Sequence, residues 1–295
     1  MDIKKYIKDR AALVAEYLDE RYREPGPSVP ALLNEAMRYS LLAGGKRIRP
    51  VLAIAAYEAC GGRGEDILPC AAALEAIHTY SLIHDDLPAM DNDDLRRGKP
   101  TNHKVYGEAM AILAGDGLLT EAFLMILGNS AVIPIERLHA AMYELANAAG
   151  PAGMVGGQVQ DMLSEGAEPD AEVLQYIHRH KTGALLAASV KMGAILHGTD
   201  EQTMTALGLY GEAIGLAFQV VDDILDIRGD EAEIGKPVGS DLEKHKLTYP
   251  AVYGMDESMR RAAELVDEAL HALEGMDERA EPLREIARYL LRRTS

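Results

Sequence analysis

Residues 84–101 read HDDLPAMDNDDLRRGKPT, and the rest of the chain is organised around this stretch. Five aspartates fall within ten residues and are followed by the pair Arg96-Arg97. Carboxylates this dense repel one another unless cations lie among them, and Mg²⁺ is typically held by one or two carboxylates, water and phosphate oxygens. Arginine offers a planar donor fork that matches phosphate. The stretch therefore indicates metal ions bridging carboxylates to a phosphate, although a solvated acidic surface explains the aspartates alone equally well.

The segment that leads into this stretch favours the metal interpretation. It is apolar from Ala71 to His84, and we expect a helix from Asp66 to about Leu87 that is largely buried. On that helix His78, Ser81 and Asp85 share one face, because they are spaced by three and seven residues. Carboxylates that emerge from a buried helix require a partner, since an unpaired buried charge is unfavourable.

The composition restricts the class of protein. The 295 residues are 48% hydrophobic and can bury a large core, and the net charge of -17 argues against nucleic acid or an anionic membrane as a partner. The longest uncharged run, 145–160, is broken by Gly150-Pro151 and is too short to span a membrane, and the first residues contain no apolar signal core. We expect a soluble, cytoplasmic protein with no membrane span.

Helix-forming residues dominate throughout, and alternating runs of β-branched residues are missing. This pattern predicts an all-α fold, and we expect one domain over residues 1–295. The helices should be separated by clusters of glycine and proline. These clusters are Pro25-Gly26-Pro27, Gly44-Gly45, Gly61-Gly62, Gly150-Pro151 and Gly235-Lys236-Pro237.

A basic segment, Lys46-Arg47-Ile48-Arg49-Pro50, follows the break at Gly44-Gly45. Three cations beside free backbone N–H groups suit a phosphate. Basic residues at a helix C-terminus, where they interact favourably with the helix dipole, explain the same residues, and this explanation is by itself the favoured one. His78 is likewise an ordinary core histidine unless Lys46 and Arg49 approach it.

A second acidic cluster, Asp222-Asp223-Ile224-Leu225-Asp226, lies on a segment that is otherwise apolar. On a helix its aspartates and Gln219 form one polar stripe. An ion-paired core and a second metal site both explain the stripe, and the metal site is favoured because it repeats the first cluster. Lys236 and Lys246 follow these acids much as Arg96-Arg97 follow theirs.

One further segment concentrates positive charge, His178-Arg179-His180-Lys181-Thr182-Gly183. It is no nucleotide-binding loop, because no glycine-rich loop precedes the lysine.

Together these motifs resemble the trans-isoprenyl diphosphate synthases, and the bacterial farnesyl diphosphate synthases most of all. The resemblance spans roughly Gly44 to Pro250, with the motifs in the right order. It rests on Asp85-Asp86-x4-Asp91 with Arg96-Arg97, Asp222-Asp223-x2-Asp226, Gly45-Lys46-Arg47-Ile48-Arg49-Pro50, Lys181-Thr182, Phe218-Gln219 and Lys246-Leu247-Thr248-Tyr249-Pro250.

The resemblance implies an all-α isoprenoid-synthase bundle around a deep central cavity, usually as a homodimer. It implies Mg²⁺, three ions per active site, that clamp the diphosphate of an allylic substrate. The metal ligands implied are Asp85, Asp86, Asp91, Asp222 and Asp226. The residues implied to bind the allylic diphosphate are Arg96, Lys181 and Lys236, with Lys246 a further substrate-binding lysine. Those implied for isopentenyl diphosphate are Lys46, Arg49, His78 and Arg97.

The implied reaction is Mg²⁺-assisted ionisation of the allylic diphosphate, attack by isopentenyl diphosphate, and loss of a proton to the departed diphosphate. The Thr182 hydroxyl, the Gln219 amide oxygen and the Lys181 backbone carbonyl would stabilise the carbocation. Tyr80 and Ser81, five and four residues before the first aspartate, lie under the growing chain in the family, and an aromatic residue at the first position is typical of synthases that stop at C15.

The expected product is therefore farnesyl diphosphate. Asn92-Asp93 and Thr101-Asn102-His103-Lys104 also resemble geranylgeranyl (C20) diphosphate synthases, and this product is the alternative. A terpene cyclase usually carries a different second metal motif. A non-catalytic subunit of a prenyl synthase typically has lost one acidic motif, and a structural protein that binds divalent ions leaves Arg96-Arg97 and Lys181 unexplained.

Overall fold

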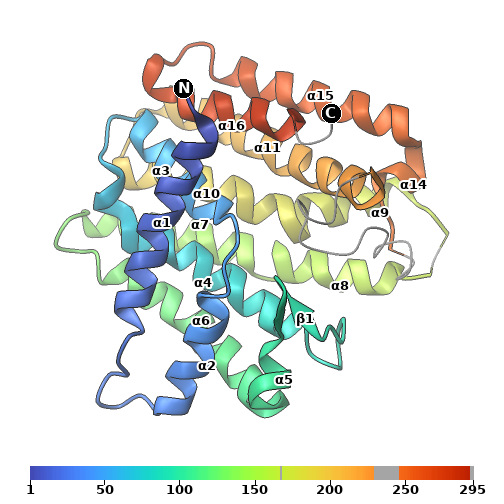
Figure 1. The fold of residues 1–295 in the computed structure, drawn as a ribbon. Coiled ribbons are helices and arrows are strands. Elements are labelled where there is room, and N and C mark those ends of the chain that lie inside the picture. The colour runs from blue at the N-terminus through green and yellow to red at the C-terminus, as the bar shows by residue number, and fades with distance from the viewer. Residues whose placement is uncertain (167, 229–245, 293–295) are drawn as a thin grey trace.

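The computed structural model describes residues 1–166, 168–228 and 246–292. The regular structure within them is helical apart from one short hairpin (Figure 1), which confirms the predicted all-α class. The α-helices are α1 (Ile3–Arg21), α2 (Ala31–Leu41), α3 (Ile48–Ala59), α4 (Leu68–Asp85), α5 (Asn102–Tyr106), α6 (Glu108–Leu127), α7 (Ile135–Ala149), α8 (Met154–Ser164), α9 (Ala171–Ile177), α10 (Ala184–His197), α11 (Glu201–Arg228), α14 (Tyr249–Tyr253), α15 (Met255–Ala272) and α16 (Glu281–Arg292). The short elements are the 3₁₀ helices η1 (Gly64–Ile67) and η3 (Glu278–Ala280), the π-helix η2 (His178–Gly183), and the strands β1 (Leu95–Arg96) and β2 (Lys99–Pro100).

The hairpin was not predicted from the sequence. Its strands pair antiparallel, and Arg97 and Gly98 join them with φ of 54° and 74°. Positive φ at both central residues is typical of the type I′ turn that closes two-residue hairpins. Strands of two residues are too short to show an alternating pattern, so nothing in the hydrophobic periodicity indicates them.

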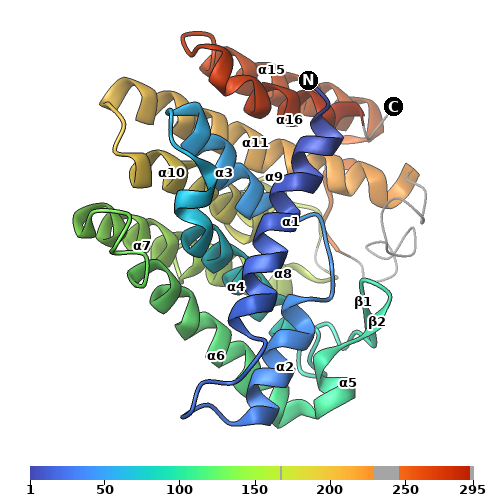
Figure 2. The same ribbon diagram turned by 60° about the vertical axis from the view of Figure 1, so that its left-hand side comes forward.

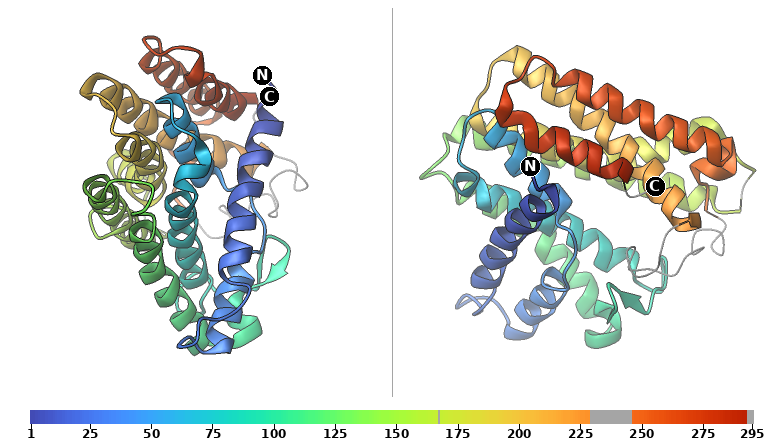
Figure 3. Two further views of the ribbon diagram at one scale, coloured as in Figure 1. Left: turned by 90° about the vertical axis from the view of Figure 1, so that its left-hand side faces the viewer. Right: turned by 45° about the horizontal axis from the view of Figure 1, so that its top comes forward.

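The central helix of the bundle is α10, which packs against α3, α7 and α11 (Figures 1 and 2). Beyond α11 lies a layer made by α15 and α16, and toward the other end of the molecule α4 packs along α6 (Figure 3). Buried apolar side chains form two clusters, one around α4 and α6 and one around α11 and α15, and α3 and α10 contribute to both. Because α4 and α11 both belong to this framework, their acidic ends are held in fixed positions.

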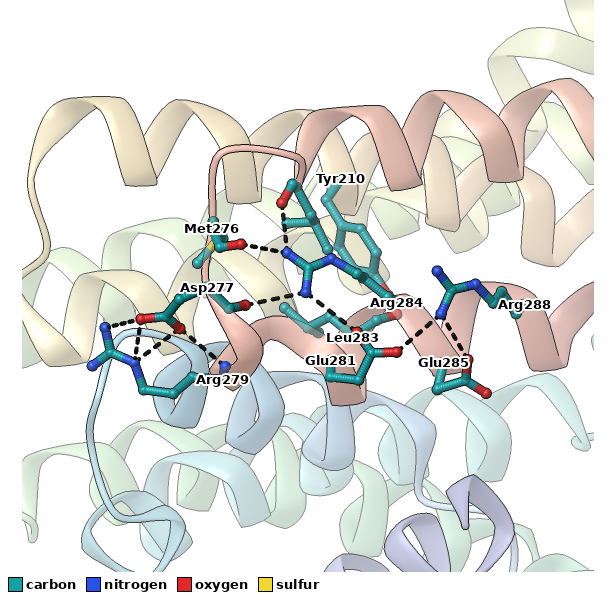
Figure 4. Close-up of polar contacts among 10 residues, drawn as sticks. Tyr210, Met276, Asp277, Arg279, Glu281, Leu283, Arg284, Glu285 and Arg288 are labelled. Carbon is teal, nitrogen blue, oxygen red and sulfur yellow. Dashed lines mark hydrogen bonds and ion pairs between the residues drawn. The ribbon is translucent and has the colours of Figure 1, made fainter. Parts of the chain in front are cut away.

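The corner between α15 and α16 is closed by polar contacts (Figure 4). The Arg284 guanidinium donates to the carbonyls of Leu273 at 2.8 Å and Met276 at 2.6 Å, and so fixes the turn that follows α15. The hydroxyl of the buried Tyr210 donates to the Leu283 carbonyl at 2.7 Å and ties α11 to α16. These contacts stabilise the outer layer against which α11 rests.

Two of the described helices are long and apolar enough to cross a membrane, by length and composition alone. They are Glu108–Leu127, whose apolar window is 39% buried, and Glu201–Ile227, whose window is 56% buried. The sequence prediction of no membrane span considered only uncharged runs and did not anticipate these helices. Core helices of soluble proteins pass the same test.

Candidate active site

The first acidic motif begins where α4 ends. After Asp85 the chain folds back, so that the Asp91 amide donates to the Asp85 carbonyl at 2.8 Å and brings the two aspartates together. Burial raises the pKa of Asp85 to about 6; the Lys181 ammonium opposes this rise, and the Asp91 and Asp86 carboxylates add to it. Three carboxylates and one lysine therefore share one electrostatic environment.

Asp86 has a different role from its neighbour. It is 3% exposed and accepts from Nε of Arg96 at 2.9 Å, and Arg96 also contacts Asp93 at 3.1 Å. Burial raises the pKa of Asp86, and the hydrogen bonds from Arg96 oppose the rise. The hairpin thus directs Arg96 back to the motif, where Arg96 and Asp86 stabilise the acidic loop. Metal ligation by Asp86 and phosphate binding by Arg96 stay predictions.

The basic segment meets α4 around a buried glutamate that the sequence analysis did not single out. Glu75 is 1% exposed and pairs with the Arg47 guanidinium, and Arg97 lies 3.9 Å from the same carboxylate. Burial lowers the pKa of Arg97. The Glu75 carboxylate opposes this lowering, and the Arg47 guanidinium adds to it. Glu75 lies one helical turn before His78 on an alanine-rich segment, and a lone glutamate there was the signal that could have identified it.

His78, one turn along α4, faces the same arginines. Its pKa is held well below the ordinary value by burial and then by the guanidiniums of Arg49, Arg97, Arg47 and Arg96. Of the two cations that the phosphate-binding interpretation of His78 requires, Arg49 acts on this imidazole, and the role itself stays a prediction. Lys46 is exposed at the start of this segment. A neutral imidazole among several guanidiniums suits a polyanionic ligand.

Arg49 links this basic cluster to the second acidic motif. It is 9% exposed, and its Nε has no hydrogen-bond partner in the described structure. Burial lowers the pKa of Arg49 to about 10; Glu75 opposes this effect, Arg97 reinforces it, and Asp222 opposes it from α11. A buried donor without a partner is costly, so a ligand oxygen at Nε would relieve the penalty.

The four polar residues of the second motif do not act as the single stripe expected from the sequence. Asp223 is 2% exposed and accepts from Nε2 of Gln219 at 2.8 Å and from the Tyr249 amide at 2.7 Å, while Nε2 of His178 lies 3.2 Å away. Asp222 is half-buried and Asp226 is buried. Asp223 is therefore explained by hydrogen bonds within the core, and the metal explanation stays open for Asp222 and Asp226. Because Gln219 donates through its nitrogen to Asp223, the orientation of its amide is fixed.

The segment with Lys181 and Thr182 forms the π-helix η2 rather than regular α-helix. A Cβ on Gly157 of α8 would lie 2.1 Å from the Lys181 amide nitrogen, so only glycine permits this approach of α8 to η2. On the same helix α8, the buried Asp161 accepts from Nζ of Lys181 at 2.5 Å. Helix α8 therefore positions Lys181 through Gly157 and Asp161. Thr182 is half-buried beside it.

Lys246 lies beside the first acidic motif. Its Nζ lies 3.7 Å from Oδ2 of Asp91, although the two residues are far apart in the sequence. Lys236, the other lysine expected here, falls outside the described residues. The contact brings the Lys246-Leu247-Thr248-Tyr249-Pro250 segment to the loop of the first motif.

The two residues expected to determine product length lie on α4 below Asp85. Tyr80 is 7% exposed, belongs to the apolar cluster around α4 and α6, and contacts the His84 ring edge-on at 5.8 Å between centroids. Burial raises the pKa of Tyr80, and the Asp85 carboxylate adds to the effect. Ser81 is half-buried and donates to the His78 carbonyl at 2.9 Å.

The donor chemistry of this site suits magnesium. Among the described residues, no group of three or more histidine, cysteine, aspartate or glutamate side chains is already gathered as a metal cage. Mg²⁺ usually needs no such cage, since one or two carboxylates together with substrate phosphate oxygens hold it. The raised pKa of Asp85, due to burial and in part to Asp91, marks a carboxylate that a bound dication would stabilise in its ionised form.

Comparison with known proteins relates this site to a family. The family model described as Polyprenyl synthetase matches residues 30–287. A geranylgeranyl pyrophosphate synthase from Capsicum annuum is 50% identical over 291 residues, which make up 98% of this chain and 78% of the relative. A farnesyl diphosphate synthase from Geobacillus stearothermophilus is 54% identical over 250 residues, 84% of each chain. The crystal structure of an FPP/GFPP synthase from Zymomonas mobilis has a TM-score of 0.86 at 36% identity and covers 98% of this chain and 99% of that chain.

Proposed function

This chain belongs to the polyprenyl synthetase family, whose substrates are isoprenyl diphosphates, and we propose that it condenses isopentenyl diphosphate with dimethylallyl and geranyl diphosphate to give (E,E)-farnesyl diphosphate. The observation that carries the proposal is the meeting of both acidic motifs with the basic residues. The Lys181 ammonium lowers the pKa of Asp85, and the Asp222 carboxylate raises the pKa of Arg49. Nζ of Lys246 lies 3.7 Å from Asp91. One site can thus hold an allylic diphosphate at the acids and isopentenyl diphosphate at the arginines.

The family is generally magnesium-dependent, and Asp85, Asp91 and Asp222 are the residues that would hold the ions, with Asp86 and Asp226 adjacent. Bound Mg²⁺ supplies Lewis-acid stabilisation of the leaving diphosphate. Lys181 contributes positive charge next to the first motif, and Asp161 fixes its direction. Arg49, Arg97 and His78 bind the second diphosphate.

The same arrangement supplies the groups that would stabilise the carbocation. With its nitrogen bound to Asp223, the Gln219 amide is left with its oxygen as the free acceptor, and this dipole would stabilise a developing positive charge. The hydroxyl of Thr182 and the backbone carbonyl of Lys181, both on η2, would contribute in the same way. No side chain acts as the final base in this scheme, and the departed diphosphate takes the proton.

The length of the product depends on Tyr80. Its buried ring one to two turns below Asp85 supports a floor that stops the chain at C15. Geranylgeranyl diphosphate is the second candidate, favoured by the names of relatives such as the Capsicum annuum protein. A non-catalytic subunit is less well supported, because both acidic motifs are intact in the sequence.

We also propose a homodimer in the cytoplasm. Leu113, Leu124 and Leu127 share one face of α6 and are 53%, 52% and 40% exposed. A row of exposed leucines is typical of a protein–protein interface. A second copy of the chain is the proposed occupant, and the net charge of -17 is that of a readily soluble protein.

The test is a product analysis. Purified protein is incubated with labelled isopentenyl diphosphate and, separately, with dimethylallyl, geranyl or farnesyl diphosphate, with Mg²⁺ or with chelator, and the dephosphorylated alcohols are chromatographed. Farnesol from the first two starters, only with Mg²⁺ and with farnesyl diphosphate left unused, supports the proposal. Geranylgeraniol would favour the C20 alternative, and no condensation with any starter would favour the non-catalytic subunit.

A further inference from the structure

The buried carboxylate of Glu75 lies at the centre of the basic cluster. On α4 it is 1% exposed, and the Arg47 guanidinium, itself 5% exposed, donates to it. Arg97 lies 3.9 Å away. Glu75 thus lies among the guanidiniums of Arg47, Arg97 and the neighbouring Arg49, and Asp222 acts on Arg49 from α11. Three arginines against these two carboxylates leave a positive charge that suits an anion.

Arg47 is fully engaged within the protein. It donates to Glu75 and also to the carbonyl of Leu41, at the end of α2, and it adopts a left-handed φ of 50°. Few residues other than glycine hold such a backbone conformation without surrounding support. Arg47 therefore joins α2, α3 and α4, and its donors to Glu75 and Leu41 are not available to a ligand.

Arg97 and Arg49 are placed differently. Arg97 donates to the Gly44 carbonyl, and its guanidinium lies over Gly45, where an added Cβ would come within 2.4 Å of the guanidinium carbon. Arg49 leaves its buried Nε without a partner in the described structure. The donors open to a diphosphate thus come from these two arginines, and Glu75 acts on both.

We infer that Glu75 is a positioning residue for the isopentenyl diphosphate site: it holds Arg47 and Arg97 in place so that Arg49 and Arg97 present their donors together, and it does not contact the ligand. The inference rests on the proposed function, since it names how that function's second substrate is bound. Glu75 acts through the arginines, and its removal would let the buried Arg47 and Arg49 and the half-buried Arg97 repel one another and separate.

A positioning role and a purely electrostatic role of Glu75 predict opposite changes in the affinity for an anion. If Glu75 contributed only its negative charge, replacing it with the neutral isostere glutamine would strengthen the binding of an anion. If Glu75 positions the arginines, the same replacement weakens binding, because Arg47 loses its ionic partner and the donors of Arg97 and Arg49 no longer converge. The sign of the change in affinity separates the two explanations.

The experiment compares the full-length wild-type protein with Glu75→Gln. Steady-state kinetics should show the KM for isopentenyl diphosphate raised at least ~10-fold, with the KM for geranyl diphosphate and kcat within about twofold of the wild type. Glu75→Asp, which keeps the charge on a shorter side chain, should restore part of the loss. An unchanged or lower KM for isopentenyl diphosphate would overturn the inference, as would a parallel change in both KM values and kcat.

Matched variants separate positioning from general destabilisation. Glu58 lies on α3, away from the basic cluster, and its carboxylate is 2.7 Å from the Arg10 guanidinium. Glu58→Gln should lower the melting temperature without changing either KM. If Glu75→Gln does not fold, Arg47→Lys provides the test, because a lysine cannot reach Glu75 and the Leu41 carbonyl together. It should raise the KM for isopentenyl diphosphate, and an unchanged value would count against the inference.

Direct binding separates this inference from the proposed function. Calorimetry with inorganic diphosphate in the presence of chelator reports the basic site without metal. If the wild type binds diphosphate but condenses no substrate, the proposed function fails while the comparison with Glu75→Gln still decides the inference. Affinity reduced at least ~10-fold in the variant supports positioning, and equal or tighter binding contradicts it.

Discussion

The imidazole Nε2 of His178 lies 3.2 Å from Oδ2 of Asp223, and this contact joins the π-helix that carries Lys181 to the helix that carries the second acidic motif. The same oxygen accepts from the Tyr249 amide at 2.7 Å. Asp223 therefore serves the framework, whereas its neighbour Asp222 is half-buried and stays available. Two adjacent and chemically identical residues should respond oppositely to the same substitution.

Asp223→Asn is expected to destabilise the protein. An amide cannot accept from all three donors that face this carboxylate, and a buried donor left unsatisfied costs ~1–3 kcal/mol. The melting temperature should fall by roughly 3–10 °C, as measured by calorimetry. Asp222→Asn is the matched control: it should change the melting temperature by less than about 2 °C but lower kcat at least ~100-fold. Equal melting temperatures for the two variants would contradict this division.

Tyr80→Ala is expected to lengthen the product beyond C15, because it removes the ring proposed as the floor. It should also lower stability by ~3–5 kcal/mol, the usual effect of truncating a buried aromatic residue. Tyr57→Ala is the control, since Tyr57 on α3 is equally 7% exposed and belongs to the same apolar cluster. Chromatography of the alcohols should show longer products for the first variant only. An unchanged C15 product would remove Tyr80 as the floor.

Binding of isopentenyl diphosphate at about pH 6 is expected to take up protons. The pKa of His78 lies well below its usual value because of burial and the nearby arginines, so the imidazole is neutral in the free protein. A diphosphate that offsets the charge of the arginines raises this pKa and favours the protonated form. Calorimetry in two buffers of different ionisation enthalpy measures the protons exchanged, and fewer should be taken up by His78→Gln than by the wild type, since the diphosphate titrates equally in both. Equal proton exchange by the wild type and His78→Gln would exclude His78 as the group that titrates.

The same depressed pKa has a consequence for stability. Below the ordinary histidine pKa the unfolded chain binds a proton at His78 that the folded chain does not, so this residue lowers stability as the pH falls below about 6.5. Denaturant unfolding of wild type and His78→Gln between about pH 5 and 7 should show a smaller loss in the variant.

Leu124→Glu is expected to convert the proposed dimer to a monomer. The new charge would lie on the exposed leucine face of α6, where a partner would have to bury it. Leu209→Glu is the control, because Leu209 on α11 is 56% exposed and lies outside that face. Light scattering after size-exclusion chromatography gives the mass of each variant. A wild-type monomer, or a dimer that survives the Leu124 substitution, would argue against this interface.

The fold class and the motifs were accessible from the sequence alone. A composition rich in helix-forming residues, broken by Gly/Pro clusters, predicts an all-α chain. Dense aspartates beside arginines indicate metal ions and phosphate, because like charges packed closely together must be balanced by opposite charges. The family followed from the order of Asp85-Asp86-x4-Asp91, Lys181-Thr182 and Asp222-Asp223-x2-Asp226. All of these signals are local, since each depends on residues within a turn or two of one another.

What only the tertiary structure decided is which charge faces which. Periodicity put Asp222 and Asp223 on one stripe, yet a hydrogen bond from Tyr249 and a contact with His178 bind Asp223 into the framework. Periodicity likewise could not show that Glu75 pairs with Arg47, or that Lys246 reaches Asp91. The sequence by itself determined the chemistry that the site contains. Which of the site's residues belong to the framework and which face the ligand depends on contacts between helices that are distant in the sequence. The burial and pairing of a charge are set by neighbours that only folding brings together.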